Sequence, residues 1–177
     1  SNISDSIGLL ALQGPAAIKI LKELTDANLD AIENYHFIAD QKVAGIPHVL
    51  ISRTGYTGED GFELYLAGEQ TPLLWEKLLA VGEAYGVLPC GLGSRDTLRL
   101  EAGMPLYGHE LSEEITPLAA GLGFAVKTKK ASDFIGKASL TAIREDGPKE
   151  KIVGFEAIER GIPREGYKVF SSDGAEI

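Results

Sequence analysis

The residue with the clearest potential for specific ligand binding is Glu63, which follows a glycine-rich bend entered through an aromatic residue, Tyr56. The segment from Arg53 to Leu64 reads R-T-G-Y-T-G-E-D-G-F-E-L, and its glycines leave space for a flat ligand beside the backbone. A carboxylate can accept two parallel hydrogen bonds from a heterocycle with adjacent N–H donors, while an aromatic side chain covers the ring face. These residue types therefore indicate a site for a flat heterocycle.

The same segment is predicted to form a β-hairpin, because strand-forming residues flank the bend on both sides. With residues 57–60 as the loop, Tyr56 would pair with Gly61 and Thr54 with Glu63. Side chains alternate between the two faces of a strand, so Tyr56 and Glu63 would share one face. The other face, directed to the core, would carry Phe62, Leu64 and Leu66. Any half-exposed strand shows such alternation, so the alternative is that Glu63 simply faces solvent.

The elements around the bend are predicted from hydrophobic spacing and turn residues. Strands are predicted over residues 7–12, 35–43, 47–54 and 62–67, the first of them buried, and helices over residues 15–24, 72–85 and 95–102. Trp75 is interpreted as a core anchor, Ser94 as an N-cap, and Asp96 as a helix-stabilising acid in the first turn. A strand over residues 122–126 and a helix over residues 136–144 follow. This pattern is typical of the α+β class, with a mostly antiparallel sheet and flanking helices.

Composition excludes several kinds of function. The net charge of −9 would repel a phosphate backbone, so we do not expect nucleic acid as a partner. The densest basic run, residues 127–130, is interpreted as a solvated loop. A single cysteine, Cys90, and three scattered histidines offer neither a disulfide nor a metal site. No apolar run approaches the roughly 20 residues that span a bilayer. We therefore expect no membrane association and a cytoplasmic location, although a processed protein of the mitochondrial matrix would look the same.

Several motifs, in a fixed order along the chain, resemble those of the aminomethyltransferase (T-protein) family of the glycine cleavage system. They are A-L-Q-G-P at residues 11–15, R-T-G-Y-T-G-E-D-G-F-E at 53–63, G-L-G-S-R-D-T-L-R-L-E-A-G at 91–103, L-Y-G at 106–108, T-P-L at 116–118 and D-F-I-G-K at 133–137. Each motif alone is weak, but together they cover nearly the whole chain.

The resemblance implies a tetrahydrofolate site. Family members hold the pteridine edge with the hairpin glutamate, and they also use the tyrosine before the bend and an arginine of the R-D-x-L-R-L-E helix. These positions correspond to Glu63, Tyr56 and Arg95. The planar guanidinium of Arg95 could meet a carbonyl or carboxylate of the folate, whereas its alternative role is an ion pair with a neighbouring acid. No metal is implied.

The reaction implied by the resemblance belongs to glycine catabolism. A one-carbon unit passes from the aminomethyl-lipoyl arm of the H-protein to tetrahydrofolate, and ammonia is released. The family's important aspartate precedes the A-L-Q-G-P motif, so we expect no catalytic residue in this chain and no activity from it alone. The start at Ser1 and the half-built hairpin at the end both favour a truncated protein.

The polar stretch over residues 145–151 is predicted to be a linker. Residues 1–147 would then be part of the folate-binding domain, and residues 148–177 the truncated start of a C-terminal β-barrel domain, with strands over 152–157 and 167–170.

Three alternatives remain open. The chain could be the folate-binding part of a dimethylglycine or sarcosine dehydrogenase-like demethylating enzyme, which shares the fold and the folate site. It could be the related protein of iron–sulfur cluster maintenance, although that protein carries a K-G-C-x-x-G-Q-E motif where this chain has R-T-G-Y-T-G-E without the cysteine. It could also be a non-catalytic interaction module, in which case Glu63→Ala would leave small-molecule binding unchanged.

Overall fold

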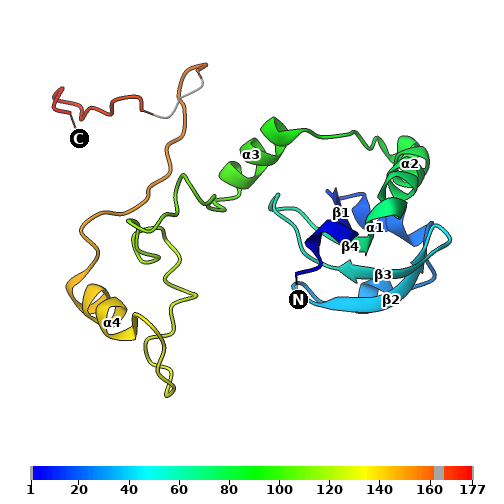
Figure 1. The fold of residues 1–177 in the computed structure, drawn as a ribbon. Helices are drawn as coiled ribbons and strands as arrows, with labels where there is room; N and C mark the ends of the chain where they lie inside the picture. The colour runs from blue at the N-terminus through cyan, green and yellow to red at the C-terminus, as the bar shows by residue number, and fades with distance from the viewer. Residues whose placement is uncertain (1, 162–165, 177) are drawn as a thin grey trace. The chain divides into compact units, whose positions relative to one another are not determined.

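A computed structural model of the chain describes residues 2–161 and 166–176 (Figure 1). The chain divides into two compact units at the junction between His109 and Glu110. The first unit contains the sheet and most of the helices, and the second contains a single α-helix among its described residues.

The first unit is built on a four-stranded antiparallel sheet with the order β1-β4-β3-β2. Its strands are β1 (Ile7–Gln13), β2 (Phe37–Val43), β3 (Ile46–Ser52) and β4 (Gly61–Ala67). The first of these four strands therefore pairs with the last of them, and Gln13 lies opposite Gly61 at one end of the ladder. This pairing brings the end of β1 to the bend between β3 and β4.

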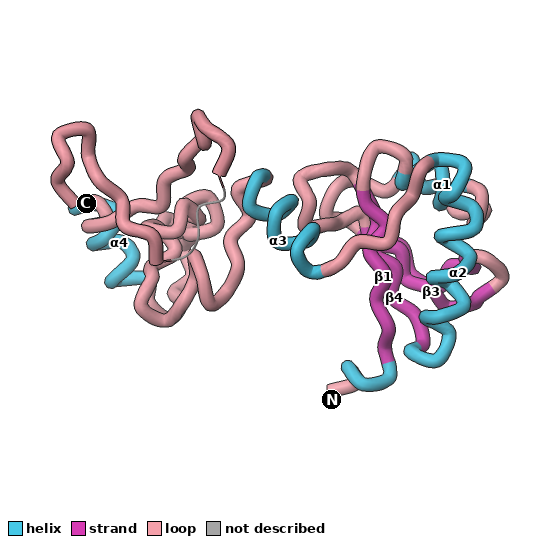
Figure 2. Tube along the Cα trace, turned by 90° about the horizontal axis from the view of Figure 1, so that it is seen from above, coloured by secondary structure: helices cyan, strands magenta, loops and turns pink. Residues whose placement is uncertain are grey.

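Helices cover one face of the sheet, as Figures 1 and 2 show. These are α1 (Ala17–Lys22) and α2 (Thr71–Gly82), which pack together with the short 3-10 helix η2 (Leu29–Ala31). Their buried side chains recur at helical spacing, such as Leu74 and Leu78 in α2. They contact the core face of β4, where Phe62, Leu64 and Leu66 are buried as predicted.

The remaining helical segments of this unit connect the larger elements. They are the 3-10 helices η1 (Ser4–Ser6), η3 (Gly68–Gln70) and η4 (Glu83–Tyr85), and α3 (Leu92–Glu101). Gly86 follows η4 in the left-handed region, with a φ of 74°, which allows the chain to turn toward α3. The helix α3 begins three residues before the predicted start, so Ser94 lies inside it and Gly91 takes the N-cap position.

The opposite face of the sheet carries Glu63 together with several apolar residues. Ile7 and Leu9 of β1 point to this face and are exposed. The prediction of a buried strand over residues 7–12 was therefore wrong for one of its two faces. The reason is positional, because β1 is an edge strand with helices on one side only.

The second unit contains the helix α4 (Lys137–Asp146), close to its predicted range. Its described residues otherwise form turns and extended segments, with one isolated antiparallel bridge between Phe170 and Glu176. The strands predicted over residues 122–126 and 152–157 were wrong, since neither segment has a neighbouring strand to pair with among the described residues. The boundary at residues 147 and 148, and the β-barrel domain after it, stay predictions.

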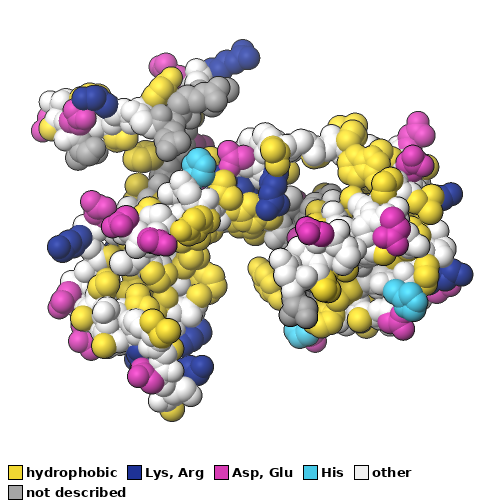
Figure 3. All heavy atoms as spheres, viewed as in Figure 1, with side chains coloured by type: hydrophobic (Ala, Val, Ile, Leu, Met, Phe, Trp, Pro, Cys, Tyr) yellow, Lys and Arg dark blue, Asp and Glu magenta, His cyan; other side chains and the backbone are white. Residues whose placement is uncertain are grey.

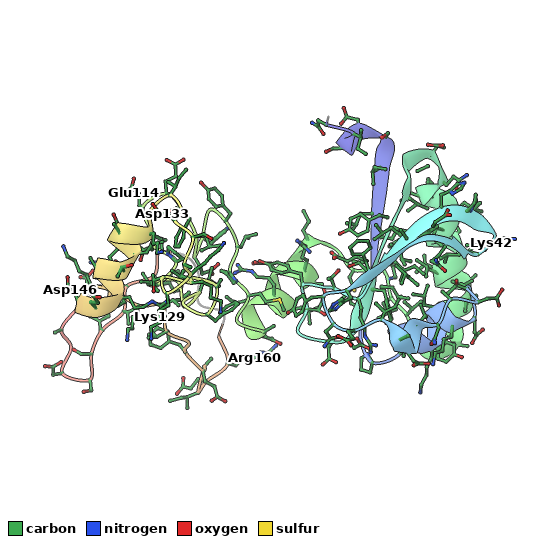
Figure 4. All side chains as sticks on the ribbon, turned by 90° about the horizontal axis from the view of Figure 1, so that it is seen from below. Lys42, Glu114, Lys129, Asp133, Asp146 and Arg160 are labelled. Carbon is green, nitrogen blue, oxygen red and sulfur yellow. The ribbon has the colours of Figure 1, made fainter. Side chains whose placement is uncertain are left out.

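The surface of the second unit is mixed in character. Hydrophobic side chains gather on it in the space-filling view of Figure 3. The exposed hydrophobic residues of this unit include Phe124, Ile135 and Phe155. The basic run over residues 127–130 lies in a turn, as predicted. Figure 4 labels one of its residues, Lys129, and the acidic Glu114 of the same unit. None of the helices in the described ranges is long and apolar enough to cross a membrane.

Candidate functional site

The candidate site is a cavity of about 270 Å³ within the first unit, along the open edge of β1. It is bounded by β1, the 53–60 loop, β4, α2, residues 87–91 and α3. The three residues that the sequence singled out, Glu63, Tyr56 and Arg95, all line this one cavity. The structure therefore brings the three residues to one cavity.

Tyr56 and Arg95 contact each other at the cavity wall. The Arg95 guanidinium carbon lies 4.5 Å from the centroid of the Tyr56 ring, within the range of a cation–π interaction. The Tyr56 hydroxyl donates a hydrogen bond of 2.5 Å to the carbonyl of Pro105, which fixes the far end of the ring. The alternative for Arg95, an ion pair with a neighbouring acid, is absent among the described residues, so its donor groups remain available to a ligand.

Glu63 has one carboxylate oxygen engaged and one open. Its Oε2 accepts hydrogen bonds from the Thr54 hydroxyl and, at 3.4 Å, from the Tyr65 hydroxyl. Its Oε1 has no donor among the described residues. Burial, and then the nearby Glu63 carboxylate, raise the pKa of the Tyr65 hydroxyl above its ordinary value. Glu63, which lines the cavity, is thus oriented by two hydroxyls and keeps acceptor capacity on its second oxygen.

The hairpin differs in register from the prediction. Ser52, not Thr54, lies opposite Glu63, so the connection between β3 and β4 runs over residues 53–60 rather than 57–60. An offset of two residues leaves the side chains of β4 on their predicted faces, whereas an offset of one would have exchanged the faces. Thr54 and Tyr56, which were predicted to lie in the strand, lie in the connection instead. The face assignment of Glu63 therefore survives an incorrect pairing.

An ion pair that sequence reasoning missed closes the ends of this connection. Arg53 donates two parallel hydrogen bonds to Asp60, of 2.9 Å from Nε and 2.8 Å from Nη2, and a third of 3.0 Å to the Ile32 carbonyl. The Arg53 guanidinium lowers the pKa of the Asp60 carboxyl below its ordinary value. Opposite charges at the two ends of the loop were the signal that could have revealed this pair.

One wall of the cavity is apolar. Trp75 is 40% exposed and lines the cavity from α2, together with Leu78 and Leu79. The interpretation of Trp75 as a core anchor was therefore wrong, because its side of α2 faces the space between α2 and α3 rather than the sheet. Cys90 is exposed and also lines this cavity.

Asp96 does not lie in the first turn of α3, as was expected, because the helix begins at Leu92, before the predicted start. Its carboxylate accepts a hydrogen bond of 2.8 Å from Arg99 Nε and forms an ion pair with Arg99 Nη2 at 2.6 Å. Arg99 is only 3% exposed and also donates to the carbonyl of Met104. Asp96 thus neutralises a buried guanidinium within α3, which is a structural role. Within the described ranges, no group of three or more His, Cys, Asp or Glu side chains could hold a metal ion.

Comparison with known proteins places this geometry in a family. The GCVT N-terminal domain matches residues 1–130. The aminomethyltransferase of Bacillus subtilis (strain 168) is 56% identical over 171 residues, which are 97% of this chain and 47% of that protein. The aminomethyltransferase of Geobacillus sp. (strain WCH70) is 57% identical over 176 residues, 99% of this chain and 48% of that protein. This chain thus spans about half the length of the curated relatives it matches.

A solved structure agrees with the sequence matches. The crystal structure of the glycine cleavage system aminomethyltransferase T from Bartonella henselae matches with a TM-score of 0.81 and 34% identity, over 97% of this chain and 45% of that chain. This match confirms the predicted fold, an antiparallel sheet with flanking helices. Since the family covers well over half of the sequence, the chain belongs to the GCVT N-terminal domain family, whose matched members are aminomethyltransferases.

Proposed function

We propose that this chain forms the tetrahydrofolate-binding part of an aminomethyltransferase of the glycine cleavage system. The observation that carries the proposal is the convergence of Glu63, Tyr56 and Arg95 on one cavity. The names of the relatives support the reaction, and the open acceptor on Glu63 supports the ligand class. The cavity volume of about 270 Å³ is near the lower end of the range for small-molecule sites, which suits a bicyclic ring.

Each of the three side chains has a distinct part in this proposal. Glu63 accepts hydrogen bonds from the N–H groups along the pteridine edge, and its negative charge strengthens them. Tyr56 presents its ring to the flat ligand, while Arg95 offers guanidinium donors to a carbonyl or carboxylate of the same molecule. The apolar wall around Trp75 excludes water from one side of the ring.

The chemistry that this arrangement serves is largely a matter of positioning. In the proposed reaction, the one-carbon unit leaves the aminomethyl-lipoyl arm of the H-protein and joins tetrahydrofolate, ammonia departs, and the dihydrolipoyl thiol is restored. A protein that holds the folate nitrogen in line with the lipoyl arm converts an encounter of two carriers into a reaction between aligned atoms. The lipoyl-carrying H-protein is thus the proposed partner, and the cytoplasm the proposed location.

Trp75 allows a direct test, because it is the single tryptophan of the chain and it lines the cavity. Tetrahydrofolate is titrated into the protein while tryptophan fluorescence is followed, and a saturable change is expected. Glu63→Gln keeps the shape but removes the charge, and one charge-assisted hydrogen bond is worth about 1.5–3 kcal/mol. The affinity should therefore fall by roughly 10- to 150-fold.

The control is Glu69→Gln, which changes an exposed glutamate outside the cavity and should leave the titration unchanged. Equal affinities for the wild type and Glu63→Gln would contradict the proposal and favour an interaction module. A saturable titration that Glu63→Gln weakens, combined with transfer from aminomethylated H-protein in the full-length protein, would support it.

A further inference from the structure

Gln13 occupies a position from which it can organise the whole bend. It is the last residue of β1 and lies opposite Gly61 in the β1–β4 ladder. Its side chain is half-buried and reaches residues more than forty positions away in the sequence. The ladder thus delivers a long polar side chain from the edge strand to the inside of the 53–60 loop.

The side-chain amide of Gln13 makes three hydrogen bonds across the bend. Its Nε2 donates to the carbonyl of Thr54 at 3.1 Å and to that of Phe62 at 3.4 Å. Its Oε1 accepts from the Thr57 hydroxyl at 3.3 Å. Carbonyl oxygens can only accept, so the amide must point its nitrogen toward them. Both ends of the amide are therefore in use, and they join the two arms of the hairpin.

The glycines of the bend make room for this amide. A Cβ on Gly55 would lie 1.9 Å from Oε1 of Gln13, and a Cβ on Gly61 would lie 2.6 Å from its Oε1 and its Cδ. Neither glycine is needed for a left-handed conformation, since a positive φ occurs at Gly58 and at neither of these two. The absence of side chains at 55 and 61 is thus explained by close approach of Gln13.

These contacts fall on the immediate neighbours of the ligand-binding residues. Thr57 follows Tyr56, Phe62 precedes Glu63, and the Thr54 hydroxyl donates to the Glu63 carboxylate. We infer that Gln13 is a positioning residue, whose amide holds the loop so that Tyr56 and Glu63 keep the spacing needed to grip a flat ligand. The inference deepens the proposed function and rests on it for the identity of the ligand.

The main test compares Gln13→Met with the wild type by two measurements. Methionine keeps most of the side-chain length but has no amide. Tetrahydrofolate affinity, followed through Trp75 fluorescence, should fall about tenfold or more, since the two ligand-binding residues lose their fixed relation. Amide hydrogen exchange over residues 53–62 should become faster without any ligand. The matched control is Gln41→Met, which removes only a local bond to the Ala39 carbonyl on β2 and should change neither quantity.

A second variant separates positioning from direct contact, because Gln13 also lines the cavity. Thr57→Val removes the donor to Gln13 Oε1 and a local acceptor for the Glu59 N–H, but it keeps the other two bonds of Gln13, so it should fold even if Gln13→Met does not. If Gln13 acts through the loop, the combined variant Gln13→Met with Thr57→Val should bind no more weakly than Gln13→Met alone. The inference is overturned if the two substitutions weaken ligand binding by factors that multiply and amide hydrogen exchange over the loop is unchanged. Gln13 would then be assigned to direct contact with the ligand.

The inference and the proposed function can fail separately. If the wild type shows no saturable titration with tetrahydrofolate, the proposed function fails, while the exchange measurement still tests the loop. Faster exchange in Gln13→Met then supports the positioning role, and unchanged exchange refutes it whatever the ligand proves to be.

Discussion

The close approach of Gln13 to Gly55 leads to a prediction about stability that needs no ligand. Gly55→Ala would insert a methyl group where the Gln13 amide now lies, 1.9 Å from Oε1. The backbone at Gly55 is outside the left-handed region, so alanine is compatible with its conformation. The clash involves the far end of a flexible side chain, so the amide can move away but must leave its three hydrogen bonds.

The magnitude follows from those bonds. Each contributes about 0.5–1.5 kcal/mol net, and the half-buried site lets water compensate for part of the loss. Against this, alanine restricts the unfolded chain and returns about 0.4–1 kcal/mol. We therefore expect Gly55→Ala to lower the free energy of unfolding by about 1–2 kcal/mol. For a unit of the length of residues 1–109, the melting temperature should fall by roughly 5–15 °C.

Urea unfolding followed by Trp75 fluorescence measures this change, and a double-mutant cycle identifies its cause. In a Gln13→Ala background the space beside Gly55 is empty, so Gly55→Ala should be neutral or slightly stabilising. A loss of 1–2 kcal/mol that persists in that background would refute the reasoning, because it would place the cost in the backbone rather than in the displaced amide.

Three further predictions concern charged and titrating groups. Asp60→Asn should lower stability near neutral pH by about 1 kcal/mol, and urea midpoints should converge with the wild type in acid. Because Arg53 lowers the pKa of Asp60 in the fold, the stabilisation is present above the ordinary aspartate pKa and is lost as the pH falls through the lower folded value; a constant difference would contradict this. Burial and the Glu63 carboxylate raise the pKa of Tyr65. In an ultraviolet titration of the tyrosines, Tyr65→Phe should therefore remove an ionisation step at high pH, and Glu63→Gln should move that step to lower pH. Asp96→Asn should destabilise the protein by about 1–3 kcal/mol in thermal unfolding, since it weakens the neutralisation of a buried guanidinium, whereas an unchanged midpoint would show that other contacts suffice.

The part of the fold that sequence predicted best is the face assignment in the sheet. Phe62, Leu64 and Leu66 are buried, and Glu63 lies on the other face, because alternation along a strand depends only on local spacing. The pairing partner of Glu63 was not predicted correctly, since register depends on the length of the connection. The Arg53–Asp60 ion pair stabilises a longer loop than the turn residues alone suggested.

The surroundings of Trp75 and Gln13 in the cavity were harder to predict than the presence of Glu63, Tyr56 and Arg95. Glu63 and Tyr56 were recognised from their chemistry, and Arg95 from a motif. The environment of Trp75 depends on how residues 87–91 and α3 return beside α2, which no local pattern encodes. The role of Gln13 likewise requires the pairing of β1 with β4, two segments that lie far apart in the sequence.

That pairing also has a kinetic consequence. Short connections join β2, β3 and β4 in succession, whereas the β1–β4 ladder joins residue pairs from Ile7 with Ala67 to Gln13 with Gly61. Closing so long a loop costs chain entropy before any contact is gained, and such non-local pairings slow folding. One side of the candidate cavity therefore forms only when β1 has paired with β4.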